Sequence, residues 1–118
     1  MARHHEIGRK GEELAALWLA GRGFQILARN WRHGRYEVDI IARLGGTCHF
    51  IEVKTGRTRK YGYPEERVGR KKIRDLMKAG AAWLYRFPGQ RRVQYDVLSI
   101  TCMGEADMDY LLIEDIHL

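Results

Sequence analysis

The sequence has little of what marks a secreted, membrane-spanning or zinc-binding protein. It contains two cysteines, Cys48 and Cys102, without CxxC spacing or a histidine cluster at ligand spacing, which argues against a zinc site. We expect both cysteines to be small core residues in a reducing compartment. Residues 1–10 lack the apolar stretch of a signal peptide, and no apolar run approaches the length of a membrane span. These absences predict a cytoplasmic protein with no membrane partner.

The composition is that of an ordinary globular domain with an excess of positive charge. The chain has 118 residues, which suits one domain with a modest core, and it shows no repeats, linkers or low-complexity tracts. Its 21 lysines and arginines against 15 aspartates and glutamates give a formal net charge of +6. This excess favours an anionic partner, nucleic acid ahead of a membrane surface. The simpler alternative is a basic protein that is merely soluble.

The periodicity of the apolar residues predicts an α/β protein with the element order α-β-β-β-α-β-β, a sheet flanked by helices. Helices are expected over 7–20 and 69–87, and strands over 24–30, 36–43, 47–55, 93–101 and 110–113. The stretch NWRHGR is expected to be a polar connection. The stretch TGRTRKYGYPEERVG is expected to be a loop, because it has glycines, a proline and no period.

The second helix carries a stripe of apolar residues at helical spacing, which is expected to face the core: Ile73, Leu76, Met77, Ala81 and Leu84. The opposite face of this helix is basic. Trp83 and Tyr85 fall off the stripe, and they are expected to cover another edge or to form a subunit contact.

The stretch YEVDIIARLGGTCHFIEVK predicts a β-hairpin, because two apolar runs flank Gly45-Gly46, a pair favoured in two-residue turns. In that register Ile41 faces Phe50 across the two strands. A different loop length would change the register, and a slip of one residue would move the charges of the two strands to opposite faces.

The same register brings acidic residues together away from the turn. Asp39 faces Glu52 and Glu37 faces Lys54, and all four side chains share the face of Ile41 because side chains alternate along a strand. Opposed carboxylates repel, and neighbouring apolar residues make their desolvation costly. A magnesium ion would resolve the conflict, with Lys54 orienting water or stabilising charge on a phosphate. The alternative is a solvated ion-pair face in which Lys54 balances Glu37.

The segments Asp39 and Glu52-Val53-Lys54 resemble the D-…-(D/E)-x-K signature of the restriction-endonuclease-like nuclease superfamily. More closely, GRKGEELAALWLAGRGFQILARNWR, YEVDIIA and FIEVKTGR resemble the YraN family of small bacterial proteins, which are similar to archaeal Holliday junction resolvases. The resemblance covers about residues 8–99. It implies a restriction-endonuclease-like mixed β-sheet flanked by helices, with residues 1–118 forming a single nuclease domain.

The resemblance also implies roles for individual residues. Asp39 and Glu52 would bind Mg²⁺ or Mn²⁺, and Lys54 would be the catalytic lysine. Glu12 would reach the same site as an outer carboxylate, although an ordinary solvated helix residue is the alternative. One position departs from the family pattern: Tyr36 stands where the family has Gly, and its ring is expected to narrow access or to stack on a base.

Basic residues next to the acidic cluster are expected to bind nucleic acid through phosphates, without reading sequence. They are Arg32, Arg35, Arg57, Arg59, Lys60, Arg70, Lys71 and Lys72. Tyr61 and Tyr63 are expected to stack on exposed bases or to wedge into a junction. The alternatives are a solvated charged face and ordinary loop packing.

The sequence therefore favours a magnesium-dependent endonuclease that hydrolyses phosphodiesters in branched or structured DNA. One alternative is a catalytically weak or inactive DNA-binding module of the same fold. Another is a structural adaptor whose basic face binds a protein or RNA. Junction-cutting enzymes generally act as dimers, so the analogy also points to a homodimer.

Overall fold

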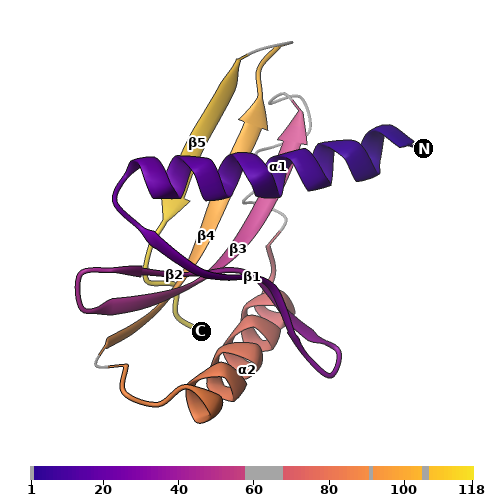
Figure 1. Ribbon diagram of the computed structural model, residues 1–118. Coiled ribbons are helices and arrows are strands. Elements are labelled where there is room, and N and C mark those ends of the chain that lie inside the picture. The colour runs from indigo at the N-terminus through magenta and orange to yellow at the C-terminus, as the bar shows by residue number, and fades with distance from the viewer. Residues whose placement is uncertain (1, 58–67, 91, 105–106) are drawn as a thin grey trace.

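The computed structural model describes residues 2–57, 68–90, 92–104 and 107–118, with only the backbone described for residues 2–9. The elements are α1 (Ala2–Gly21), β1 (Gln25–His33), β2 (Tyr36–Leu44), β3 (Thr47–Arg57), α2 (Arg70–Arg86), β4 (Arg92–Cys102) and β5 (Met108–Ile113) (Figure 1). The predicted order α-β-β-β-α-β-β is confirmed, and the architecture is that of a restriction-endonuclease-like fold.

The strands form one five-stranded mixed sheet in the order β1-β2-β3-β4-β5. All neighbours are antiparallel except β3 and β4, which are parallel. Helix α2 provides the crossover that parallel neighbours need, because it lies between β3 and β4 in the chain. The N-terminal half of the sheet is therefore a meander, and the β3–α2–β4 unit joins it to the C-terminal hairpin.

The two helices cover opposite faces of the sheet. Ile40 and Ile51 pack with Leu19 of α1, whereas the next residues along the strands, Ile41 and Phe50, pack in the cluster that contains α2. Successive side chains of a strand point to opposite faces, so these contacts place one helix on each side. In Figure 1, α1 crosses β3, β4 and β5, while α2 lies beside β1 and β2.

The hairpin register agrees with the sequence prediction. Strands β2 and β3 pair from Leu44–Thr47 to Ile40–Ile51, with Ile41 opposite Phe50. Gly45 has a φ of 58°, which fits the two-residue turn predicted there.

The prediction of a polar connection at NWRHGR is wrong for most of that stretch. Strand β1 continues to His33, which pairs with Tyr36 across a tight turn. Polar residues are compatible with β1 because it is an edge strand with several exposed side chains. Trp31 also anchors this part of the strand, since its ring packs edge-on against Trp83 with the centroids 5.7 Å apart.

The core-facing stripe of α2 is rotated from the predicted one. Its buried residues are Leu76, Ala79, Gly80 and Trp83, whereas Ala81 is exposed. The prediction that Trp83 lies outside the core is therefore wrong, while Tyr85 is 89% exposed. The small residues Ala79 and Gly80 explain the rotation, because a Cβ at Gly80 would lie 2.8 Å from the Tyr95 ring, so α2 approaches the sheet along this line.

Helix α1 meets β3 at Gly11. A Cβ on Gly11 would lie 2.3 Å from Cγ2 of Thr55, a branched side chain with little freedom to move away. The glycine therefore allows the close approach of α1 to β3. The next residue, Glu12, lies near enough to Asp39 of β2 for its charge to act on that residue.

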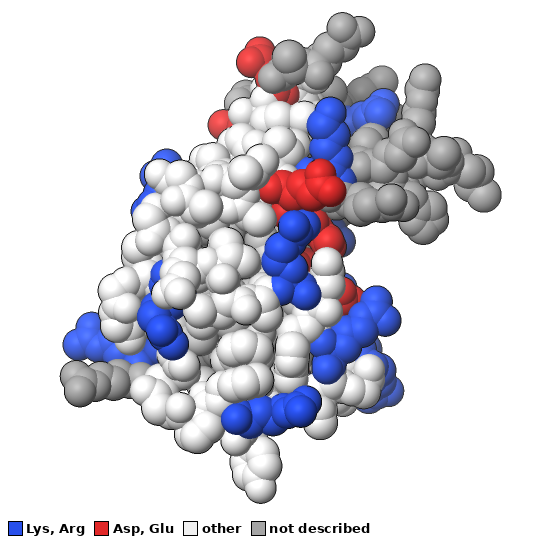
Figure 2. Space-filling model, in the orientation of Figure 1, with Lys and Arg blue, Asp and Glu red and all other residues white. Residues whose placement is uncertain are grey.

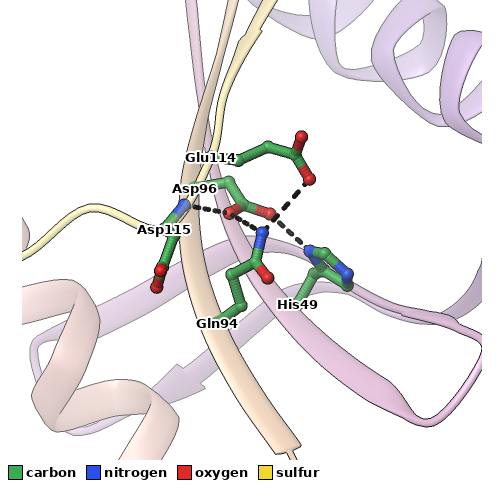
Figure 3. A network of polar contacts seen from close by, with 5 residues as sticks. All are labelled: His49, Gln94, Asp96, Glu114 and Asp115. Atoms are coloured by element: carbon green, nitrogen blue, oxygen red, sulfur yellow. Dashed lines mark hydrogen bonds and ion pairs between the residues drawn. The ribbon is translucent and has the colours of Figure 1, made fainter.

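A buried polar network joins β3, β4 and the C-terminal segment (Figure 3). Nδ1 of His49 lies 2.6 Å from Oδ2 of Asp96, and both side chains are almost fully buried. The backbone N–H of Asp115 and Nε2 of Gln94 each donate to Oδ1 of Asp96 at 3.0 Å, and Gln94 also donates to Glu114. Because Asp96 accepts from groups on three segments, it ties the C-terminal segment to β4 and β3.

Both cysteines are free thiols. Cys48 is buried in a core cluster, as predicted, whereas Cys102 is only half-buried. In the part of the chain that the structure describes, neither helix combines the length and apolar character required to cross a bilayer.

We predict that Asp96→Ala lowers the free energy of unfolding by about 3–5 kcal/mol, because a buried imidazole and two N–H donors lose their acceptor. Chemical denaturation followed by circular dichroism measures the change. Asp109→Ala removes an exposed carboxylate from β5 and, as the control, should change stability by less than about 0.5 kcal/mol. A loss below about 1 kcal/mol for Asp96→Ala would contradict an anchoring role for the network.

Candidate metal centre

The acidic cluster lies where the pairing of β2 with β3 ends. Among the described residues this pairing stops at Ile40–Ile51, so the predicted pairs Asp39–Glu52 and Glu37–Lys54 lie beyond its last member. Oδ2 of Asp39 accepts a hydrogen bond from the backbone N–H of Val53 at 2.8 Å. A carboxylate of β2 thus contacts the backbone of β3 at this point, and the side chain is fixed by the strand beside it.

A cavity of about 110 Å³ opens next to Asp39, between the sheet and the start of α2. Its walls come from the β1–β2 turn, from β2 and β3, and from α2. The lining residues are Arg35, Tyr36, Glu37, Asp39, Glu52, Lys72, Asp75 and Leu76. Four acidic side chains and two basic ones therefore surround one small space.

Asp39 is poorly suited to carry a charge without a cation nearby. Burial, followed by the negative charge of Glu52, raises the pKa of Asp39 from its ordinary value of 3.8 to about 8. The hydrogen bond from Val53 opposes this increase, and the charges of Glu12 and Glu37 add to it. The two central carboxylates are therefore close enough to repel, as the hairpin register predicted.

Glu52 is 7% exposed, and burial also raises its pKa. The opposing influences are the charge and hydrogen bond of Lys72 and the charge of Lys54. Nζ of Lys72 lies 3.4 Å from Oε1 of Glu52, and this contact, led by the charge of Glu52, raises the pKa of Lys72. A lysine from α2 thus partly neutralises the buried acid.

The specific contact of Lys72 with Glu52 was missed by the sequence reasoning, which placed Lys72 only among the phosphate-binding residues. The strand pattern predicts that Glu52 faces one side of the sheet, but it does not predict which turn of α2 lies above it. The excess of carboxylates over ammonium groups on that face was the available signal that a further cation was needed.

Lys54 shares the face of Glu52, two residues along β3, and its positive charge lowers the pKa of Glu52. Glu37 was predicted to lie opposite Lys54. The ion pair that the structure describes for Glu37 is with Arg32 on β1, whose guanidinium lies 3.5 Å from Oε2 of Glu37. Arg32 thus contacts a carboxylate at the edge of the cluster, in addition to its predicted place on a basic surface.

Glu12 reaches the cluster from the other helix. It is half-buried, and its negative charge raises the pKa of Asp39. The close packing of Gly11 on Thr55 explains this position, because it brings the middle of α1 against β3. The family pattern, and not helical periodicity, pointed to Glu12.

Tyr36 lies at the rim of the cavity, where two basic side chains contact it. Its hydroxyl accepts hydrogen bonds from Arg35 at 3.2 Å and from Lys78 at 3.5 Å, and both cations also lie within 5.3 Å of its ring centroid. These two hydrogen bonds lower the pKa of the Tyr36 phenol. Tyr36 therefore lines one side of the cavity and holds two cations there.

The predicted basic surface is described in part. Arg57 ends β3, and Arg70, Lys71 and Lys72 form the first turn of α2. On the face drawn in Figure 2, lysine and arginine side chains border the largest group of acidic side chains. Arg59, Lys60, Tyr61 and Tyr63 lie outside the described residues.

The donor set fits a hard divalent cation with few protein ligands. Within the described ranges, no group of three or more His, Cys, Asp or Glu side chains is arranged to hold a metal. Magnesium commonly uses one or two carboxylates and retains several waters, so Asp39 and Glu52 are sufficient as a protein contribution. Nζ of Lys72 already lies 3.4 Å from Oε1 of Glu52, so this carboxylate attracts positive charge.

We predict that stability depends on the charge of Asp39. Its proton is lost near pH 3.8 in the unfolded chain and near pH 8 in the fold, so the folded protein binds more protons between these values and stability falls as pH rises. With EDTA present, Asp39→Asn should be more stable than wild type by about 1–3 kcal/mol near pH 9. Thermal unfolding should show this advantage shrinking toward pH 4, and an advantage independent of pH would contradict the assignment.

The comparisons with known proteins identify the family of this chain. A family model described as "Uncharacterised protein family UPF0102" matches residues 11–100, a range that includes all four residues proposed for catalysis. The chain is 41% identical to a UPF0102 protein of Phocaeicola vulgatus over 89% of this chain and 85% of that protein. It is 43% identical to a UPF0102 protein of Leifsonia xyli over 79% of this chain and 81% of that protein. The chain therefore belongs to the UPF0102 family, the YraN family that its motifs resemble.

Proposed function

We propose that this protein is a metal-dependent endonuclease that hydrolyses phosphodiesters in branched or structured DNA. The observation that carries the proposal is the pair of buried, mutually repelling carboxylates, Asp39 and Glu52, beside a cavity bordered by basic groups. A structural role alone gives no reason to keep two such acids together. A divalent cation removes the repulsion and gives the cavity its chemistry.

Each residue then has a separate task. Asp39 and Glu52 would hold Mg²⁺ or Mn²⁺, which supplies a Lewis acid and a more acidic water when bound. Lys54 lies on the same face as Glu52, where its ammonium orients the attacking water and stabilises negative charge on the phosphate. Glu12 acts as an outer carboxylate whose charge strengthens cation binding by Asp39.

The surroundings support a phosphate backbone as the ligand. Helix α2 starts with Arg70, Lys71 and Lys72, and its N-cap, Gly69, makes no side-chain capping hydrogen bond. The partial positive charge of the helix N-terminus therefore adds to three basic side chains. Such contacts bind DNA without reading bases, which favours recognition of structure over sequence. Because both strands of a branched duplex must be cut, two active sites are needed, and we propose that the protein acts as a homodimer. We propose the cytoplasm as its location.

One observation favours a second candidate, a DNA-binding module of the same fold with weak or no catalysis. Tyr36 lines the cavity at a position where the family pattern has Gly, and it holds Arg35 and Lys78 at the rim. These cations would retain a phosphate even where the chemistry is slow. The two candidates differ in cleavage, not in binding.

We predict that purified wild-type protein cleaves branched DNA only with Mg²⁺ or Mn²⁺, and that Asp39→Ala lowers the rate at least about 100-fold. Gel assays with a labelled four-way junction measure cleavage, and anisotropy in EDTA measures binding. Binding by Asp39→Ala should persist, because the basic residues are unchanged. Asp109→Ala, on β5, is the control and should cleave like wild type. The nuclease proposal fails if wild-type cleavage is absent or survives Asp39→Ala, and binding without cleavage supports the second candidate.

A further inference from the structure

Lys72 differs from the other basic residues of the first turn of α2, because it contacts a proposed metal ligand. Its Nζ lies 3.4 Å from Oε1 of Glu52, whose side chain is 10% exposed. The charges of Glu52, Asp39 and Glu37 all act on this ammonium. Lys72 is therefore the counter-ion of the cluster in the metal-free protein.

The contact competes with a bound divalent cation. Lys72 lines the same cavity as Asp39 and Glu52, so a cation held by the Glu52 carboxylate would meet the ammonium at close range. Like charges in a partly buried space repel strongly, and only one of them can be the main partner of Glu52.

The side chain of Lys72 can leave the cluster. It is 54% exposed and stands on the first turn of α2, beside Arg70 and Lys71. A lysine stem is flexible, and the neutralisation of Glu52 and Asp39 by a metal would remove the attraction that holds the ammonium inside. Once outside, the ammonium joins the basic residues proposed to contact phosphates.

We propose that Lys72 is an internal cation that a divalent metal displaces from Glu52, and that the released ammonium then binds a DNA phosphate. This inference rests on the proposed function and adds to it a link between metal binding and DNA binding. Because such coupling is reciprocal, the metal raises the affinity for DNA by the factor by which DNA raises the affinity for the metal. Lys72 is thus a DNA-binding residue whose availability depends on the metal.

The neighbouring residue Lys71 provides a matched control. Its Nζ lies 3.1 Å from Oδ2 of Asp75, one turn further along α2, and its side chain is 82% exposed. Lys71→Met and Lys72→Met remove the same charge from adjacent positions. Long-range electrostatic effects of that loss are therefore shared, and direct competition at Glu52 is not.

The test is a titration of Mn²⁺ into EDTA-treated protein without DNA, with free Mn²⁺ counted by electron paramagnetic resonance. We expect Lys72→Met to bind Mn²⁺ about fivefold or more tightly than Lys71→Met does, because a competing cation has been removed. Equal or weaker binding by Lys72→Met would overturn the inference and leave the proposed function standing. Absence of Mn²⁺ binding by wild type would overturn both.

A second measurement compares wild type with glutamine variants at the same two positions, so it does not depend on the folding of Lys72→Met. Affinity for a four-way junction is measured once with EDTA and once with Ca²⁺, a divalent ion chosen to fill the metal site. A parallel gel assay checks whether the junction is cleaved under the same conditions. We expect Ca²⁺ to tighten DNA binding severalfold in wild type and in Lys71→Gln. In Lys72→Gln, Ca²⁺ should no longer change the affinity for DNA. An equal Ca²⁺ effect in all three proteins would contradict release of Lys72.

Discussion

The repulsion between Asp39 and Glu52 is the interaction on which the rest of this site depends. Two carboxylates that share a partly buried cavity cannot both be charged unless positive charge lies nearby. The protein supplies only part of that positive charge, through Lys72 and Lys54. The repulsion follows directly from the fold. The β2–β3 pairing ends just before these residues, the Val53 amide fixes Asp39, and α2 closes the cavity from one side.

The same sheet contains a buried acid that is fully satisfied, and the contrast is informative. Asp96 lies on β4 opposite Ile51, next to the level of Glu52 but on the other face of the sheet, and His49, Gln94 and the backbone of Asp115 all bind its carboxylate. That arrangement stabilises the chain without any added ion. Asp39 has one backbone donor and a like-charged neighbour, so its environment is incomplete without an ion. Position in the sheet does not explain this difference, whereas a binding role does.

The sequence predicted those features that depend on local patterns. The turn at Gly45-Gly46 and the alternation of the strands were sufficient to bring Asp39 and Glu52 together, and element order followed from periodicity. The errors concern contacts between distant segments. Trp83 was placed outside the core because the stripe was chosen without knowing that Gly80 allows close packing, and Lys72 was placed only on the DNA-binding surface because helix position over a sheet is a tertiary property.

Crystals grown with Mn²⁺ and measured for anomalous scattering provide the most direct test of the central claim. The account predicts one anomalous peak within about 2.2 Å of carboxylate oxygens from both Asp39 and Glu52, with the Lys72 ammonium turned away from Glu52. Crystals without such a peak, in which Lys72 still contacts Glu52 at high Mn²⁺ concentration, would contradict the claim that these two acids are kept together to bind a metal.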